Sequence, residues 1–104
     1  MRINLAFGER CEIYLDADKV VKKYNLDIAD FEYVDGRALH LEKNGRTKFV
    51  MFLNSTSYKT IAHEASHIAD YTCDFFTIKD DEFKAYMVGH IVDQVIYKLN
   101  KGKT

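Results

Sequence analysis

Three residues in the stretch IAHEASHIADY, at positions 61–71, have the types and spacing of a metal-hydrolase site: His63, Glu64 and His67, in the order H-E-x-x-H. On a helix, residues i and i+4 lie on one face about 6 Å apart along the axis, so His63 and His67 can bind one metal ion. Glu64 projects roughly 100° further round, where its carboxylate can take a proton from a water on that ion. The pattern therefore predicts hydrolysis assisted by Zn²⁺, with Glu64 as general base.

A catalytic zinc site uses three protein ligands, and three residues compete for the third place. Glu82 lies 15 residues after His67, in the expected first turn of the next helix, which an antiparallel arrangement would bring near His67. His90 lies two turns further along the same face and is the second candidate. Cys73 has the spacing of the third ligand in metzincins, but Asp70 occupies the position of the glycine that their motif needs. Glu82 is the preferred ligand, and Cys73 is expected to be a small buried thiol.

Two long helices are expected to carry these residues, because no glycine occurs between Leu53 and Gly89 and strand alternation is absent. The first would run over residues 57–72, with its cap in the sequence NSTS. The second would run over residues 81–100, capped by Asp80 and closed near Gly102. Its apolar residues recur every four positions and predict a stripe that faces the core: Phe83, Met87, Ile91, Val95 and Leu99.

The first half of the chain has the features of a small antiparallel meander. The sequences VDGR at 34–37 and KNGR at 43–46 suit two-residue hairpin turns, which gives strands over 31–34, 37–42 and 47–53. The last of these, TKFVMFL, is apolar enough to be covered on both faces.

A further hairpin and a short helix are expected upstream of the meander. INLAF and CEIYL flank a Gly-Glu pair and favour the hairpin, with Cys11, Ile13 and Leu15 on one face. LDADKVVKKYN favours the helix, with a cap at Asp16 or Asp18 and an end at Asn25. The expected fold is α+β, and the 104 residues would form one zincin-like domain with the metal site on its two C-terminal helices.

Composition argues against several other classes of protein. A net charge of −1, with 15 basic residues spread along the chain, gives no footprint for nucleic acid or an anionic membrane. The N-terminal sequence lacks the apolar core of a signal peptide, and no apolar run approaches the length of a membrane span. Two cysteines cannot form a disulfide framework and fit a reducing compartment. A cytoplasmic location is therefore expected.

The sequence HEASH, followed by DEFKAYMVGHIVDQV, resembles minimal metallopeptidases of the gluzincin type. The similarity is to short phage and prophage zincin-like proteins and to the ImmA/IrrE-type peptidase domain, and it covers about residues 45–97. It implies zinc ligands at His63, His67 and Glu82, a general base at Glu64, and hydrolysis of peptide bonds. It also implies that an extended substrate pairs beside the strand KFVMFL. The N-terminal third has no match.

One departure from this family concerns the acid that orients the first histidine. Thermolysin-like enzymes have an Asp four residues after the ligand Glu, and Tyr86 stands at that position here. Asp70, three residues after His67, is a substitute for that acid, the alternative being an exposed helical charge. Tyr86 is a candidate donor to a developing oxyanion, the alternative being a core residue. His90 is a candidate substrate contact or a core residue.

Two functions of different classes follow from these residues. The first is a zinc-dependent metallopeptidase that acts on a protein or peptide. The second is a non-catalytic phage-type module for protein interaction, either stabilised by zinc or free of metal. The presence of Glu64 favours catalysis, because this residue is needed for proton transfer and not for holding the ion.

Overall fold

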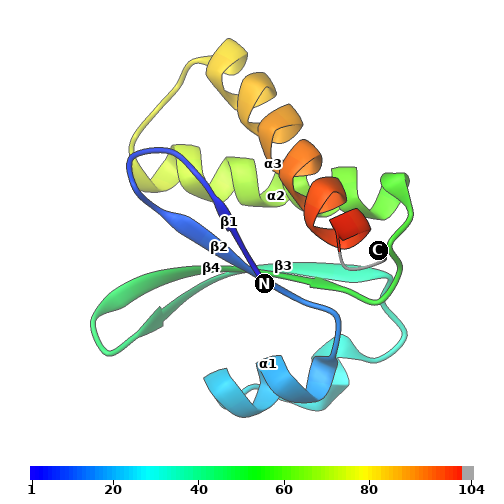
Figure 1. Ribbon diagram of the computed structural model, residues 1–104. Helices are drawn as coiled ribbons and strands as arrows, with labels where there is room; N and C mark the ends of the chain where they lie inside the picture. The colour runs from blue at the N-terminus through cyan, green and yellow to red at the C-terminus, as the bar shows by residue number, and fades with distance from the viewer. Residues whose placement is uncertain (102–104) are drawn as a thin grey trace.

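The protein is built in three layers, with a four-stranded sheet between one short helix and two long helices (Figure 1). The computed structural model describes residues 1–101. In chain order the elements are β1 (Arg2–Asn4), β2 (Arg10–Tyr14), α1 (Ala17–Tyr24), a 3-10 helix η1 (Ile28–Phe31), β3 (Gly36–Lys43), β4 (Arg46–Leu53), α2 (Tyr58–Phe75) and α3 (Asp81–Lys101). The expected α+β fold with two C-terminal helices is confirmed.

The sheet is mixed, which differs from the antiparallel meander that the sequence predicts. Its strand order is β1-β2-β4-β3, in which β1–β2 and β3–β4 are antiparallel and the central pair β2–β4 is parallel. The upstream hairpin and the KNGR hairpin are both confirmed, the latter with positive φ at Asn44 and Gly45. The predicted VDGR turn is wrong, because Gly36 begins β3 and the expected first strand is instead η1 and a loop.

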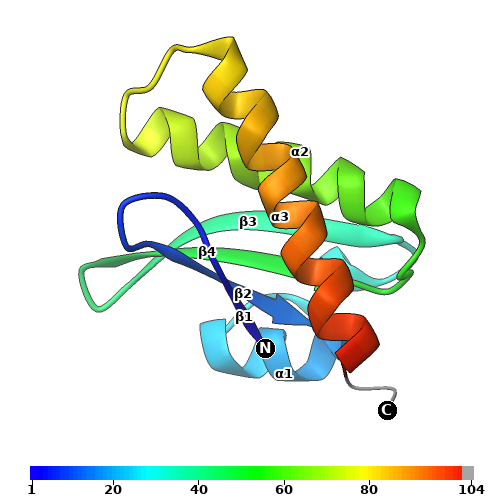
Figure 2. The same cartoon turned by 45° about the horizontal axis from the view of Figure 1, so that its top comes forward.

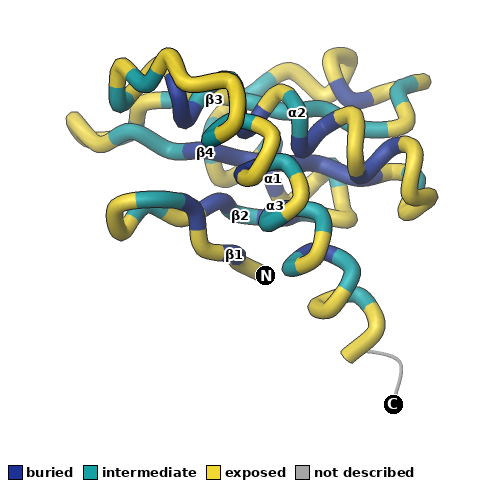
Figure 3. The backbone as a smooth tube through the Cα atoms, turned by 90° about the horizontal axis from the view of Figure 1, so that it is seen from above, coloured by how far each residue is buried: buried dark blue, intermediate teal, exposed yellow. Residues whose placement is uncertain are grey.

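Strand β4 is the centre of the core. Its residues from Phe49 to Leu53 are buried, and they alternate between the cluster under α2 and α3 and the cluster under α1. Figure 3 shows this buried stretch running through the middle of the molecule. The expectation that β4 is covered on both faces is confirmed. The expectation that a substrate pairs beside β4 is wrong, because β2 and β3 occupy both of its edges; the edge strands are β1 and β3.

The helices begin where the capping residues predict. The Asp16 side chain caps α1, which ends with Asn25 in the left-handed conformation, and Ser57 caps α2. The Asp80 carboxylate accepts the backbone N–H of Glu82 at the start of α3. The predicted stripe of α3 faces the core, with three buried residues (Met87, Ile91, Val95) and two partly buried ones (Phe83, Leu99). The closure expected near Gly102 lies outside the described residues.

Both long helices cover the same face of the sheet, as the tilted view in Figure 2 makes plain, and α1 covers the other. Within residues 1–101, none of the helices is long and apolar enough to cross a membrane. Cys11 and Cys73 are both free and buried, as expected for Cys73. Leu15, expected beside Cys11 and Ile13, lies beyond the end of β2 and is 48% exposed.

A carboxylate ties α1 to the sheet. Glu12 of β2 accepts hydrogen bonds from the hydroxyl groups of Tyr14 and Tyr24 and from the ammonium group of Lys23. Burial acts to raise the pKa of Glu12, but hydrogen bonds from Lys23, Tyr24 and Tyr14 outweigh it and hold that pKa below its usual value. Because the folded-state pKa is lowered, the ionised group stabilises the fold above the unfolded-state pKa, and this stabilisation is lost as the pH falls through the folded-state value.

Substituting Glu12→Gln should therefore lower the free energy of unfolding at pH 7 by about 1–2 kcal/mol, since charge-assisted hydrogen bonds become neutral ones. The difference from wild type should shrink as the pH falls below the ordinary pKa of a glutamate, where the unfolded chain is protonated first, and it should be lost once the pH passes below the lowered folded-state pKa. Urea unfolding at pH 7 and pH 3 measures both values. Glu42→Gln on β3, at an exposed position, is the control and should change little at either pH. An equal loss at both pH values would contradict the electrostatic explanation.

Candidate metal centre

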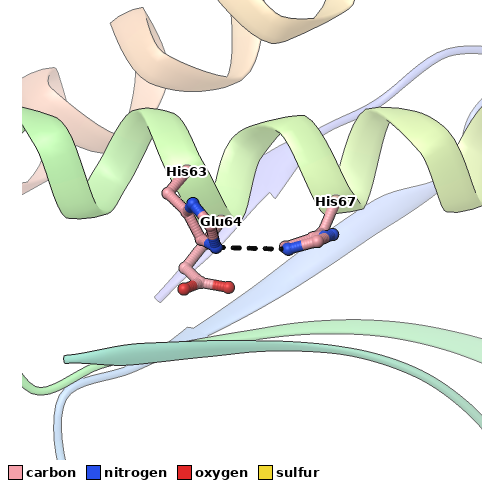
Figure 4. A group of neighbouring side chains, drawn as sticks. All are labelled: His63, Glu64 and His67. Carbon is pink, nitrogen blue, oxygen red and sulfur yellow. Dashed lines mark hydrogen bonds between the residues drawn. The ribbon is translucent and has the colours of Figure 1, made fainter. Parts of the chain in front are cut away.

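His63, Glu64 and His67 lie together on the side of α2 that faces the edge strand β3 (Figure 4). The two Nε2 atoms of His63 and His67 are 3.3 Å apart. Two nitrogens bound to one zinc ion at about 2.05 Å in tetrahedral geometry are roughly 3.3 Å apart, so this spacing fits a single ion. One possible ligand atom from each of the three residues lies within 4.8 Å of the others. The three residues that the sequence brings together in a motif are thus brought together in space.

Glu64 is a largely buried residue whose carboxylate has no protein donor and reaches solvent, since the described residues contain no buried side-chain oxygen without a hydrogen bond. Its side chain is 6% exposed, and within the described chain it takes part in no hydrogen bond or ion pair. Burial raises the pKa of the Glu64 carboxyl, against the opposing effect of His63, His67 and Arg37. Ionisable groups whose pKa is shifted by burial, and which still reach solvent through a hollow, concentrate at functional sites. Glu64 therefore has the environment of a proton acceptor and not of a structural side chain.

The carboxylate opens onto a hollow at the N-terminal end of α2. The hollow has a volume of about 400 Å³, and its walls come from the loop before β3, the segment after β4 and the first two turns of α2. Asp35, Lys59 and Thr60 line it together with His63 and Glu64. A small substrate segment placed here would therefore lie beside both the first imidazole and the carboxylate.

Gly36 allows α2 to approach the sheet this closely. A Cβ atom at this position would lie 2.9 Å from Cγ of Glu64, 3.0 Å from the carbonyl oxygen of Phe52 and 3.0 Å from Cγ2 of Thr60. These separations are too short for ordinary contacts. Gly36 has no positive φ, so the position needs glycine for space and not for backbone conformation. The glycine that the sequence suggests as a turn residue instead packs against the side chain of Glu64.

Glu82, the third ligand expected from the sequence, is not part of this group. It is exposed in the first turn of α3, and α3 packs on a different side of α2 from the imidazoles. Figure 4 shows the three side chains leaving α2 toward the strands while α3 passes on the other side. The expected antiparallel neighbour exists, but the rotation of α2 about its own axis points the histidines away from it.

The second group of predicted residues also lies away from the imidazoles. Asp70 forms an ion pair with Lys84 of α3, with 2.5 Å between oxygen and nitrogen. Asp70 is therefore a partly exposed helical charge, which is the alternative to an acid that orients a histidine. Tyr86 is 72% exposed, so it is not the core residue that the sequence allowed. Its ring stacks on His90, with centroids 6.2 Å apart, and both border a shallow hollow on the outer face of α3.

Two aromatic neighbours of the centre are absent from the sequence prediction. The ring of Tyr71 stacks on His67 with centroids 6.4 Å apart, and His40 of β3 lies 5.9 Å from Tyr71. Tyr71 stands four residues after His67, and the same helical spacing places His63 and His67 on one face. This spacing is a sequence signal from which the position of Tyr71 follows. His40 carries no such signal, because its place depends on which part of β3 lies beneath α2.

No match was found among family models, curated proteins or solved structures. The resemblance to gluzincin-type peptidases therefore rests on the residues quoted above, and the roles that it implies for His63, Glu64, His67 and Glu82 are proposals.

Substituting Gly36→Ala should lower the free energy of unfolding by about 1–3 kcal/mol, because the new methyl group must displace Glu64, Thr60 or the backbone of β4. It should also move Glu64 relative to the imidazoles. Gly89→Ala on α3 is the matched control, since a Cβ there would meet nothing within 4 Å, and it should stabilise the helix by about 0.5–1 kcal/mol. Thermal and urea unfolding of both variants measures the contrast. A neutral Gly36→Ala variant would show that α2 does not need this approach.

Proposed function

We propose that the protein is a zinc-dependent metallopeptidase in which His63 and His67 hold the metal and Glu64 is the general base. The observation that carries the proposal is the arrangement of these three side chains. Two ring nitrogens stand 3.3 Å apart, and beside them lies the carboxylate of the largely buried residue Glu64, with no hydrogen bond from the described residues. A structural role for Glu64 would require a donor, whereas a proton acceptor requires an open oxygen.

The chemistry divides between the metal and the chain. Bound zinc would polarise a carbonyl oxygen and lower the pKa of a bound water to about 7. His63 and His67 supply neutral imidazole nitrogens, which requires each ring to carry its proton on Nδ1. The Glu64 carboxylate accepts a proton from the nucleophilic water and later transfers it to the leaving amine. The raised pKa of Glu64, caused by burial, brings its basicity closer to neutral pH.

Two imidazoles leave room around the ion. Among the residues described, only Glu64 joins His63 and His67 in a group that could hold a metal, and Glu82 would need a different packing of α3 to reach it. We propose that water and a substrate group take the remaining positions. Such a site should bind zinc more weakly than one with three protein ligands, and the substrate itself should contribute to the affinity.

The proposed substrate is an extended peptide or an exposed segment of a protein. The hollow of about 400 Å³ beside Glu64 is large enough for one or two side chains, and it opens beside β3, which has a free edge. We also propose a cytoplasmic location, because the two free cysteines fit a reducing compartment.

A second function is favoured by one observation, which is that Glu82 does not join the two imidazoles. Catalytic zinc sites use three protein ligands, so a centre with two suits a module that binds a partner and completes the site with the partner's ligand. This non-catalytic role predicts metal binding without turnover, and the two tests below separate it from catalysis.

The first test is metal binding by protein purified without added metal. Wild type should bind close to one zinc ion per chain in a titration with a chromogenic chelator. His63→Ala and His67→Ala should each weaken zinc binding at least tenfold, because each variant loses one of the two imidazole ligands. Glu82→Gln should bind zinc like wild type, since the residue lies outside the group. Absence of zinc binding by wild type at micromolar metal would refute the metal centre, and loss in Glu82→Gln would require α3 to repack.

The second test is turnover of a quenched fluorescent peptide library by the zinc-loaded protein. Glu64→Gln should keep the zinc but lose activity by about 10²–10⁴-fold, because the amide cannot accept the proton. Glu42→Gln is the matched control on an exposed strand position. Cleavage that persists in Glu64→Gln would exclude Glu64 as the base. Zinc binding without cleavage of any library peptide or of denatured protein would favour the interaction module.

A further inference from the structure

A second site with the opposite charge lies at the other end of β3. The β1–β2 turn at Gly8 and the β3–β4 turn at Gly45 form the walls of a hollow of about 550 Å³. We call it the cationic hollow, because four cationic side chains line it: Arg2, Arg10, Arg46 and Lys48. A smaller hollow of about 390 Å³ adjoins it, shares Arg2 and Arg10, and adds Lys98 of α3.

The four cations share one face of the sheet. Val50 and Phe52 of β4 face the α1 side, and because side chains alternate, Lys48 and Arg46 face that side too. Tyr14 of β2 packs against the same cluster, which places Arg10 on the same face. Arg2 lies opposite Glu12 in the β1–β2 register, and directly opposed residues point to the same face.

Helix α1 ends before it reaches the hairpin turn. The α1-side cluster extends as far as Leu41, the residue opposite Lys48, and Figure 1 shows the β3–β4 hairpin extending beyond the end of α1. Arg2, Arg10 and Arg46 are exposed and Lys48 is half-buried. The cationic hollow therefore lies between the β1–β2 and β3–β4 turns, where these side chains are open to solvent.

None of these four cations is paired in the part of the chain that the structure describes. Lys23 pairs with Glu12 and Lys84 with Asp70, whereas Arg2, Arg10, Arg46 and Lys48 take part in no hydrogen bond or ion pair through their side chains. Arg10 and Lys48 directly precede Cys11 and Phe49, the pair at which the register between β2 and β4 begins, and both line the same hollow. Like charges gathered in one place repel one another, and a bound anion would relieve the repulsion.

The geometry points to an acidic polypeptide segment as the ligand: we propose that the cationic hollow binds a stretch of Asp or Glu side chains from a protein partner. Three of the four cations are arginines, whose guanidinium groups bind carboxylates through two parallel hydrogen bonds. Glu9 and the engaged Glu12 also border the hollow, and they can accept backbone N–H groups of a peptide.

A peptide fits the surface better than a nucleic acid does. Single strands need several aromatic platforms on which successive bases stack, and the hollow offers one exposed ring, Phe75, because Phe49 is buried in the core. Duplex binding needs a long basic stripe, whereas the cations here are confined to one end of the sheet and Glu9 stands among them.

The proposal is tested by fluorescence anisotropy with labelled decaglutamate as the probe and the full chain as the receptor. Wild type should bind the probe, with an affinity that falls as sodium chloride rises from 50 to 200 mM. Arg10→Gln/Lys48→Gln should weaken binding about tenfold or more. The same double variant should be at least as stable to urea as wild type, because the repulsion is removed. That second measurement separates a binding defect from a folding defect.

Lys19→Gln/Lys79→Gln is the matched control, because it removes two exposed positive charges outside the hollow. It should retain the wild-type affinity. Equal weakening in both double variants would reduce the effect to net charge and overturn the site, as would absence of binding by wild type at 50 mM salt. Tighter binding of a 20-nucleotide single strand or duplex than of decaglutamate would overturn the choice of ligand. Zinc content should be unchanged in both variants, so the proposal stands or fails independently of the metal centre.

Discussion

The close packing of α2 against the first residue of β3 is the constraint on which the rest of the site depends. Gly36 has no side chain, and Glu64 and Thr60 occupy the space that a Cβ atom would need. This contact fixes both the height of α2 above the sheet and its rotation about its own axis. The rotation then decides which helical faces are buried, and it leaves His63 and His67 between the sheet edge and solvent.

The same rotation explains why α3 takes no part in the centre. Helix α2 uses Ile61, Ala65 and Ile68 for the core beneath it, and α3 covers a further side, where Asp70 pairs with Lys84. The imidazoles are on the remaining side. Two long helices can therefore pack on one face of a sheet while the side chains of an H-E-x-x-H motif point toward an edge strand and not toward the neighbouring helix.

Local patterns in the sequence predict the elements well, and relations between distant segments account for the errors. Capping residues and apolar spacing are local, so the starts of α1, α2 and α3 follow from Asp16, Ser57 and Asp80. Asn44–Gly45 and Asp35–Gly36 are equivalent as turn signals, yet only the first has positive φ at both residues. The second is set by the approach of Glu64, which lies 28 positions further along the chain. The parallel pairing of β2 with β4 is likewise non-local.

The two sites share one physical principle, which is that each contains charge that the fold itself does not neutralise. At one end of β3, the carboxylate of the largely buried residue Glu64 lies beside two imidazoles and has no protein donor. Toward the other end, adjacent cations face solvent without an acceptor among the described residues. Gly36 and Lys43 are the first and last of the eight residues of β3, which places them about 23 Å apart at 3.3 Å per residue. A net charge of −1 conceals this separation, because folding has gathered opposite unbalanced charges at opposite ends of one edge strand. Unfavourable electrostatics of this kind is retained most readily where a ligand of the opposite charge offsets it: a cation at the imidazoles and an acidic segment at the hollow.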